Sequence, residues 1–309
     1  MDLKSKIILI SGPTASGKTN FAVKLAKKIN GEIINADSMQ VYKELKILTA
    51  RPSKNEQKNI KHHLYGFQSV KKIFSTGSWL KLTIKKIKEI QRKNKTPILV
   101  GGTGLYFKAL TDGLVTIPNI PKKIRLQMRN LQKKIGQRKF YKMLVKFDPL
   151  SKNKINSNDS QRTIRAYEIK KYTKKSLFEW FGKTKSNFQR NQFIKFYIDF
   201  PRSELINRIN KRVDKMFDKG AIREVKIFLK LKARKENSPH KVIGIREISE
   251  FIENYKDLEE TKDRIAIKTR QYAKRQSTWA RRYMNDWNKI DLNRVNFSDL
   301  KKIINNNLF

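Results

Sequence analysis

The sequence predicts an α/β fold, in which a parallel sheet is flanked by helices and carries a mostly helical insertion. Short apolar runs alternate with stretches of helical periodicity, which is the pattern of βαβ units. The first apolar run leads directly into a glycine-rich segment, GPTASGKT at residues 12–19, and then into a helical stretch. This succession of strand, loop and helix indicates a sheet of the P-loop type.

The expected strands are short and apolar, whereas the expected helices repeat apolar residues every three or four positions. In the first helix, Phe21, Leu25 and Ile29 follow this spacing. Strands are expected at residues 6–10, 31–36, 97–102 and 193–200, the last ending before Pro201. Helices are expected at residues 18–29, 76–93, 202–235 and 240–287, with a last short helix at 296–309.

Residues 115–192 form the expected insertion. This region is rich in Lys, Arg, Gln and Asn, has helical spacing and contains no convincing strand, while Pro118 and Pro121 interrupt its start. The prediction is therefore a catalytic core made of residues 1–114 and 193–309, with its C-terminal helices, and a helical insertion at 115–192.

The composition excludes several classes of protein. The 309 residues include no cysteine, which excludes disulfides and thiolate metal sites, and we expect a reducing, cytoplasmic location. Three histidines without cysteine argue against a structural zinc site, whereas a hard cation held by oxygen atoms remains compatible. No stretch approaches the roughly 20 apolar residues of a membrane span, so we expect no membrane association. The N-terminal run MDLKSKIILISG lacks the features of a signal peptide.

The net charge of +44 predicts a polyanionic partner, and nucleic acid is the most plausible one. A compositional bias is the alternative explanation for part of this charge. Most of the excess is lysine, and asparagine and isoleucine are also frequent, as in chains encoded by AT-rich genomes. The arginines are therefore more informative than the lysines.

The segment at residues 12–19 fits the pattern G-x-x-x-x-G-K-[ST]. Its glycines permit a tight backbone path along which N–H groups point at an anion, Lys18 adds a positive charge, and the Thr19 hydroxyl is placed to bind Mg²⁺. The expected phosphate-binding residues are Gly12, Pro13, Thr14, Ala15, Ser16, Gly17, Lys18 and Thr19.

The loop predicts phosphate binding but does not identify the group attached to the phosphates. A kinase normally also has an apolar strand that ends in a metal-supporting Asp, whereas the strand ILVGGTG ends in glycines. The strand EIINAD does end in Asp37, which could serve metal binding or act as a base. Because ligands lie at the carboxyl ends of parallel strands, we expect Asp37 to face Lys18.

Seven segments, in order along the chain, resemble the tRNA dimethylallyltransferase (isopentenyltransferase) family. They are GPTASGKT (12–19), NADSMQVY (35–42), HHL (62–64), PILVGGTGLYF (97–107), QRTIRAYE (161–168), KVIGIRE (241–247) and TRQYAKRQSTW (269–279). The resemblance implies transfer of a dimethylallyl group from dimethylallyl diphosphate to the exocyclic N6 amine of the adenine immediately 3′ of the anticodon in tRNA, with release of pyrophosphate. The loop would then hold the diphosphate of a prenyl donor.

Such a transfer requires a held leaving group, an activated amine and exclusion of water. Lys18, Thr19 with Mg²⁺ and the loop N–H groups would neutralise the departing pyrophosphate. Asp37 is the candidate base, because a carboxylate at hydrogen-bonding distance orients the weakly nucleophilic amine and accepts its proton. Thr103 offers a hydroxyl near the transferred group or the amine. The alternative for Asp37 is an Asx-type cap on the next turn, and both roles are compatible.

The resemblance also implies contacts with the anticodon stem-loop of tRNA, for which the insertion is a natural clamp. Gln40 has the donor and acceptor to read a base edge, and Arg246 could alternatively reach the pyrophosphate. The alternatives without an RNA contact are that Met39 only packs in the protein interior and that residues 161–165 form a basic helix face exposed to solvent. The expected tRNA contacts are Asp37, Ser38, Met39, Gln40, Thr103, Arg125, Gln161, Arg162, Thr163, Ile164, Arg165, Lys241, Val242, Ile243, Gly244, Ile245 and Arg246.

Several positions depart from the family pattern. Leu48 stands where a glycine is common and Arg51 where a lysine is, while Ile245 and Ala280 replace usual aromatics. These departures affect loop shape and docking rather than the reaction. We expect a monomer without an obligate protein partner. Two other functions stay open: a P-loop kinase of a nucleotide or small metabolite, and a basic RNA-binding module with a degenerate loop.

Overall fold

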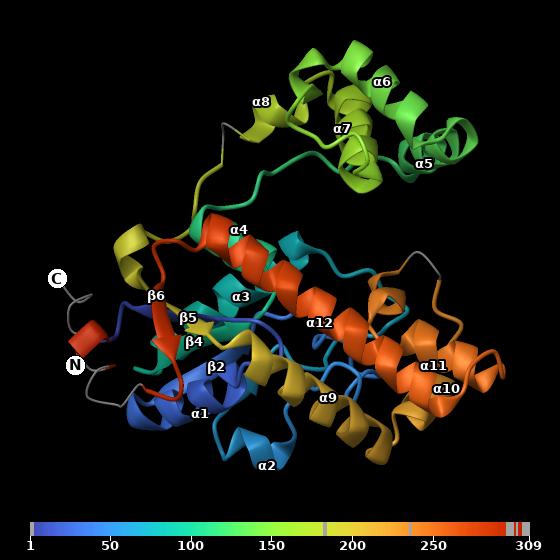
Figure 1. Ribbon diagram of the computed structural model, residues 1–309. Helices are drawn as coiled ribbons and strands as arrows, with labels where there is room; N and C mark the ends of the chain where they lie inside the picture. Colours follow the sequence, from blue (N-terminus) through green and yellow to red (C-terminus); the bar gives the residue numbers. More distant parts are fainter. Residues whose placement is uncertain (1–2, 182–183, 235–236, 295–299, 301, 305–309) are drawn as a thin grey trace. The chain divides into compact units, whose positions relative to one another are not determined.

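The computed structural model describes residues 3–181, 184–234, 237–294, 300 and 302–304 (Figure 1). The chain divides into two compact units. One consists of residues 1–111 and 187–309 and is called the α/β unit. The other, residues 112–186, is called the helical unit. The boundaries expected from the sequence were residues 115 and 192.

A six-stranded parallel sheet forms the centre of the α/β unit, which confirms the predicted fold class. The strand order is β3-β2-β4-β1-β5-β6, so the strand that precedes the glycine-rich loop lies inside the sheet. In the register, Ile10 pairs with Val100 on one side and with Phe196 on the other. The strands are β1 (Ile7–Ser11), β2 (Gly31–Asn35), β3 (His62–His63), β4 (Thr96–Gly101), β5 (Phe193–Asp199) and β6 (Asn288–Asp291).

Helices cover both faces of the sheet, because strand residues point alternately to opposite sides. Ile8 and Ile10 pack with Phe21 and Leu25 of α1 on one face. The opposite face packs against α3, α4 and the end of α12. The helices of the α/β unit are α1 (Lys18–Lys28), α2 (Lys54–Gln57), α3 (Thr76–Gln91), α4 (Gly104–Thr111), α9 (Arg202–Asp218), α10 (Ala221–Lys230), α11 (Ile245–Ile252) and α12 (Leu258–Tyr283).

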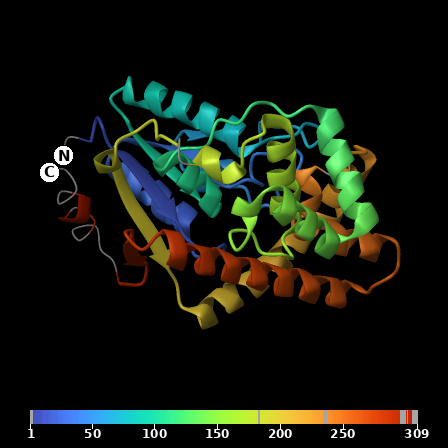
Figure 2. The same ribbon diagram turned by 90° about the horizontal axis from the view of Figure 1, so that it is seen from above.

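A third apolar cluster packs α9, α10, α11 and part of α12 around residues 41–48. The helix α12 contains 26 residues and therefore spans about 39 Å. It runs beside α9, as both Figure 1 and Figure 2 show. This long helix joins the third cluster to the sheet, since Ile265 and Ala273 belong to the former while Ala280 packs on the latter.

The helical unit consists of α5 (Lys122–Ile135), α6 (Gln137–Phe147), α7 (Ser160–Thr173) and α8 (Leu177–Phe181). The first three pack against one another around a small apolar core that includes Leu144, Ile155 and Ala166. No strand occurs among the described residues of this unit, which agrees with the helical interpretation of the insertion.

The expected long helices are each divided. The stretch 202–235 breaks at Gly220, whose φ of 91° is left-handed, so α9 ends and α10 begins there. The stretch 240–287 separates into α11 and α12. The short strands β3 and β6 were missed, because each gives too little periodicity to detect. The predicted terminal helix at 296–309 lies mostly outside the described residues.

Among the helices that the structure describes, none has the length and apolar character needed to cross a membrane.

Candidate active site

The glycine-rich loop connects the carboxyl end of β1 to the start of α1, the position that its sequence predicts. Gly17 immediately precedes α1 with a φ of 87°, and a Cβ atom there would lie 3.1 Å from the Leu292 side chain. A side chain at this position would therefore be strained. The Lys18 Nζ atom donates a hydrogen bond to the Pro13 carbonyl at 2.9 Å, which places the ammonium over the loop.

Two distant helices hold the loop. Gln276 of α12 accepts a hydrogen bond from the Thr14 N–H at 2.8 Å and donates to the Gly102 carbonyl at 2.9 Å. Arg212 of α9 donates to the Thr14 hydroxyl at 2.9 Å. A Cβ atom on Gly102 would lie 2.0 Å from the Gln276 amide, so this glycine admits Gln276. The loop and the end of β4 are thus fixed by one amide side chain.

Asp37 follows the carboxyl end of β2, where Asn35 fixes the chain. The Asn35 side chain accepts from the Asp37 N–H and donates to the carbonyls of Asp37 and Leu64. Asp37 Oδ1 accepts from the N–H groups of Met39 and Gln40, at 2.8 and 3.4 Å. Its Oδ2 atom accepts no hydrogen bond from the residues that the structure describes. The capping role expected as an alternative is therefore present, and it occupies only one carboxylate oxygen.

Thr103 joins the end of β4 to the segment after Asp37. Its hydroxyl accepts from the Ser38 N–H at 2.9 Å and donates to the Ser38 hydroxyl at 3.3 Å. Thr103 lines neither of the two cavities described next. Its observed contacts are with Ser38.

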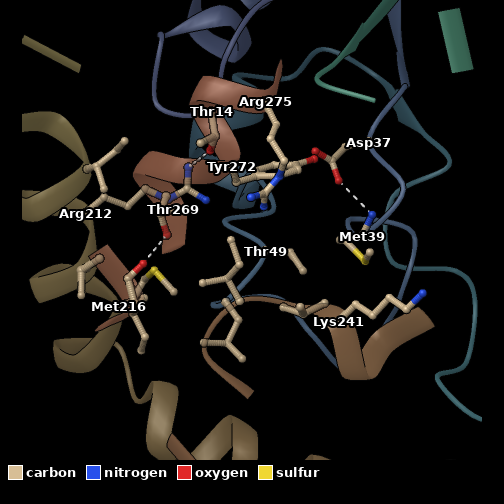
Figure 3. A pocket seen from close by; sticks show the side chains of 16 residues that line it. Thr14, Asp37, Met39, Thr49, Arg212, Met216, Lys241, Thr269, Tyr272 and Arg275 are labelled. Atoms are coloured by element: carbon tan, nitrogen blue, oxygen red, sulfur yellow. Dashed lines mark hydrogen bonds between the residues drawn. The ribbon is translucent and has the colours of Figure 1, made fainter. Parts of the chain in front are cut away.

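Two adjoining cavities lie at this edge of the sheet. The loop cavity has a volume of about 130 Å³, and Lys18, Thr19 and Gln40 are among its lining residues. The apolar cavity has about 290 Å³ (Figure 3). Its lining includes Met39, Leu48, Ile209, Val213, Met216, Val242, Ile243, Ile265, Thr269, Tyr272 and Arg275.

Four residues line both cavities: Thr14, Asp37, Thr49 and Arg212. The Asp37 carboxylate therefore stands where a polar compartment meets an apolar one. A substrate with an anionic part and an apolar part would place the bond between those parts near this carboxylate.

Burial and Asp37 dominate the electrostatics. Burial lowers the pKa of Lys18 to about 8, although Asp37 opposes the shift, and Arg212 lowers it further. Burial likewise lowers the pKa of Arg212, again opposed by Asp37. Burial first, and the Asp37 charge second, raise the pKa values of Tyr65, Tyr106 and Tyr272. These tyrosines keep their protons at neutral pH.

The residues of the glycine-rich loop fall into two groups. Thr14, Ala15, Gly17, Lys18 and Thr19 line the loop cavity, whereas Gly12, Pro13 and Ser16 do not. The Ser16 side chain is fully buried, and its hydroxyl has no hydrogen-bond partner in the described part of the chain. A direct phosphate contact is therefore expected from the first group only.

Gln40 is engaged within the protein, because its amide nitrogen donates to the carbonyls of Thr49 and Ala50 at 2.9 and 3.2 Å. The expectation that Gln40 reads a base edge has no support in this geometry. Met39 is partly buried against the third apolar cluster and lines the apolar cavity.

The segment KVIGIRE runs from the last residue of a short 3-10 helix, Ser238–Lys241, into the first turn of α11. Val242 and Ile243 line the apolar cavity, and Lys241 does so through its stem while its side chain extends away from Asp37 (Figure 3). Ile245 is only 3% exposed and belongs to the core, so its side chain is closed to an RNA. Arg246 lines neither cavity. Its Nε atom pairs with Glu250 at 2.7 Å, so the alternative role at the pyrophosphate is not supported.

The other expected tRNA contacts lie in the helical unit. Arg125 is on α5, while Gln161, Arg162, Thr163, Ile164 and Arg165 are on the first turns of α7. The Thr163 side chain is fully buried and donates to the Asp159 carbonyl, so it is not available to an RNA. The Arg162 side chain is 73% exposed and that of Arg165 is 40% exposed.

Arg212, Thr49 and Gln276 were not predicted as site residues, although Arg212 and Thr49 line both cavities and Gln276 supports the loop. No local signal identifies Arg212, because α9 carries other cations beside the same apolar stripe, among them Arg208 and Lys211.

The residues present are compatible with Mg²⁺ at the loop cavity. Thr19 and Asp37 line that cavity with oxygen donors, and Mg²⁺ usually combines one or two such groups with substrate phosphates and water. Among the described residues, no three His, Cys, Asp or Glu side chains gather into a metal cage. The donor set therefore suits a cation that arrives with a phosphate ligand.

These features define a class: an α/β protein of the P-loop fold in which a polar cavity and an apolar cavity share a carboxylate at their common wall. The family model described as IPP transferase matches residues 40–283. A tRNA dimethylallyltransferase from Pelagibacter ubique is 62% identical over 291 residues, 94% of this chain and 93% of the relative. One from Rickettsia conorii is 43% identical over 304 residues, 98% of this chain and 83% of the relative.

Solved structures agree. A tRNA isopentenylpyrophosphate transferase from Bacillus halodurans has a TM-score of 0.69 and 33% identity, covering 99% of this chain and 95% of that chain. A eukaryotic dimethylallyltransferase acting on tRNA has a TM-score of 0.83 and 29% identity, and the match covers 98% of this chain and 79% of that chain. This chain belongs to the tRNA dimethylallyltransferase family and is a transferase. The kinase alternative finds no support in these comparisons.

Proposed function

We propose that this protein transfers the dimethylallyl group of dimethylallyl diphosphate to the N6 amine of the adenine immediately 3′ of the anticodon in tRNA, and releases pyrophosphate. The observation that carries the proposal is the position of Asp37 on the shared wall of a polar and an apolar cavity. Family membership supports the same reaction class.

The loop cavity is suited to the diphosphate. Lys18 and Arg212 supply positive charge, and the N-terminus of α1 adds partial positive charge. In the reaction, the bond between the allylic carbon and the diphosphate oxygen breaks, and its electron pair leaves with the pyrophosphate. Cations placed in advance around that oxygen stabilise the charge that develops there.

The amine needs a base on the side of the allylic carbon opposite the leaving diphosphate. The lone pair of an exocyclic adenine amine is delocalised, so the new N–C bond forms as the nitrogen gives up a proton. Asp37 is held by its Oδ1 atom through the Met39 N–H and presents Oδ2 as the acceptor for that proton. Thr103 acts indirectly, because its hydroxyl fixes Ser38 beside Asp37.

The apolar cavity suits the prenyl chain and the face of a purine. Leu48, Ile209 and Met216 provide an apolar lining, and Tyr272 offers a ring beside Asp37. Such a lining keeps water from the allylic carbon, where hydrolysis would compete with transfer. An adenine stacked in an anticodon loop reaches this cavity only if it is turned out of the stack.

Mg²⁺, bound through the Thr19 hydroxyl together with the diphosphate, would neutralise phosphate charge. We propose that the protein works as a monomer. A cysteine-free composition suits the cytoplasm, where the tRNA substrate is found.

The helical unit is proposed to bind the anticodon stem through exposed cations on α5 and α7. The exposed side chains of Arg162 and Arg165 support this role, because arginine binds phosphate bidentately. Binding through phosphates makes affinity fall with salt, since counterions are released from the RNA.

The test is mass spectrometry of tRNA nucleosides after incubation with dimethylallyl diphosphate and Mg²⁺. The expected result is an adenosine heavier by one dimethylallyl group, formed together with pyrophosphate and absent when either substrate is omitted. Hydrolysis of ATP without any modified nucleoside would instead favour the kinase alternative. Tight tRNA binding without turnover would favour a binding module.

A further inference from the structure

A buried carboxylate lies in the helical unit, far along the chain from the loop and from Asp37. Glu168 of α7 is only 3% exposed. Its Oε2 atom meets Arg165 Nη1 at 3.5 Å, which is a long contact, and its buried Oε1 atom has no hydrogen-bond partner among the described residues. A buried carboxylate without full hydrogen bonding costs stability, so its presence needs another reason.

Three arginines act electrostatically on this carboxylate: Arg165 contacts it directly, whereas Arg125 donates a hydrogen bond to Asn119 at 3.3 Å. Arg165 lies one turn earlier on α7, and Arg125 and Arg129 lie one turn apart on α5, which packs against α7. Burial raises the pKa of Glu168, while Arg165, Arg129 and Arg125 oppose that rise. The Arg125 Nε atom is also buried without a partner in the described part of the chain. Glu168 and these three residues are called the Glu168 cluster.

The arrangement is asymmetric. The anion is inside, whereas the Arg165 side chain is 40% exposed and Arg129 is an exposed residue. A buried ion pair rarely stabilises a fold more than apolar residues would, but it can fix the direction of its exposed partner. Guanidinium groups directed by a buried anion present their remaining N–H donors outward, as bidentate phosphate binding requires.

We propose that Glu168 is a positioning residue that orients Arg165, Arg125 and Arg129 for the phosphates of the tRNA stem, and that Arg129 is itself a phosphate contact. This inference rests on the proposed function, because it needs the helical unit to bind tRNA. It adds a role for an acidic residue in a surface whose purpose is to attract an anion.

The test is tRNA binding by the full chain carrying Glu168→Gln. Removal of a negative charge, taken alone, predicts tighter binding to RNA. The positioning role predicts the opposite: affinity falls about fivefold, as expected when a hydrogen bond of ordinary strength is lost. The slope of log K against log salt should also become shallower, by about 0.7–0.9 for each phosphate contact that is lost.

The matched control is Asp148→Asn. Asp148 is another buried carboxylate of the same unit, 1% exposed, but it accepts from the hydroxyls of Ser151 and Ser176. If Glu168 serves only the fold, both variants should lower the melting temperature and change tRNA affinity alike. The proposal requires that Glu168→Gln weakens binding more than Asp148→Asn does at a similar loss of stability.

A double-mutant cycle identifies the route of the effect. If Glu168 acts through Arg165, then the double variant should bind tRNA about as weakly as Arg165→Ala alone. If the two residues act independently, the two fold losses of affinity should multiply. Arg129→Ala should make the slope of log K against log salt shallower by the amount expected for about one lost phosphate contact. Arg138 is an exposed arginine of α6 and serves as the control, because Arg138→Ala should change this slope less. Should Glu168→Gln fail to fold, Glu168→Asp keeps the charge but shortens its reach, and its affinity should lie below that of the unaltered chain.

Two results overturn the inference in distinguishable ways. Unchanged or tighter binding by Glu168→Gln, or unchanged binding by Glu168→Asp, while Arg165→Ala binds weakly, removes the positioning role and leaves the proposed function standing. Unchanged binding by Arg165→Ala, Arg125→Ala and Arg129→Ala together removes the tRNA role of the helical unit itself.

Discussion

The α/β unit and the helical unit differ in where they place their charged side chains and in what those side chains contact. In the α/β unit, Asp37, Lys18 and Arg212 come from three separate elements and line the loop cavity, and each makes a hydrogen bond with the glycine-rich loop or with the segment after β2. In the helical unit, Arg162 is exposed and pairs with Asp159 at the start of α7, and Arg165 is partly exposed and pairs with Glu168 of the same helix. The first arrangement orders atoms for a reaction, and the second presents charge to a large partner.

This contrast suggests a division of labour. Substitutions in the cavities should change the rate of the chemical step and the binding of the donor. Substitutions of exposed arginines should change the affinity for tRNA and its salt dependence. Asp37→Asn should change only the rate and Arg165→Ala only the tRNA affinity, and the contrast fails if both quantities change in either variant.

The largest effect is expected from Asp37→Asn. Asparagine keeps the Oδ1 acceptor for the Met39 N–H but cannot take up a proton, so the single-turnover rate should fall roughly 10²–10⁴-fold with tRNA affinity unchanged. Asp199→Asn is the control, because Asp199 ends the strand β5 of the same sheet and lines neither cavity. Equal losses for the two variants would remove Asp37 as the base.

The second effect is a pH dependence of donor binding. The pKa of Lys18 is lowered to about 8, so the ammonium is charged below that pH and is lost above it. Affinity for pyrophosphate, measured by calorimetry, should therefore fall above about pH 8 more steeply in the unaltered chain than in Lys18→Arg, which keeps its charge throughout. Ionisation of pyrophosphate itself affects both proteins alike. An equally steep decline in that variant would assign the dependence to another group.

The third effect concerns Glu224, which holds the turn that carries Thr49. Its carboxylate accepts from the N–H groups of Lys46, Ile47 and Leu48 at 2.7–3.0 Å. Glu224→Gln weakens these charge-assisted hydrogen bonds. The free energy of unfolding should therefore fall by about 2 kcal/mol, and kcat/KM should fall a few-fold. Urea denaturation measures the first quantity, and exposed Glu253→Gln is the control. A Gln variant as stable as the control would show that this turn is held otherwise.

The smallest effect is expected from Arg165→Ala. Its tRNA affinity should fall about tenfold, because a hydrogen bond to a charged group contributes roughly 1.5 kcal/mol. The rate at saturating tRNA should remain that of the unaltered chain. Filter binding gives the affinity, and a loss of the saturating rate would place Arg165 in the chemistry instead.

The sequence predicted the parts of the fold that depend on local periodicity. The strands β1, β2, β4 and β5 and the helices α1 and α3 lie where apolar spacing placed them. The division of 202–235 was missed because Gly220 alone breaks a continuous helical pattern. The strand β6 was missed because its burial depends on pairing with β5, which local sequence does not encode.

The site was predictable where one segment carries its own chemistry. The loop at 12–19 and Asp37 could be assigned because strand ends converge at one edge of a parallel sheet. Arg212 and Gln276 could not, since they contact Thr14 across sequence separations of 198 and 262 residues. Thr163 and Ile245 were named as tRNA contacts from their segments, yet their side chains face inward.

The most direct test of the division of labour follows two quantities on the unaltered chain as salt is raised from about 50 to 200 mM. One is the Kd for tRNA, and the other is the single-turnover rate at saturating tRNA and saturating donor. The account predicts that Kd rises steeply while the saturating rate stays constant. A saturating rate that falls in parallel with the affinity would contradict it.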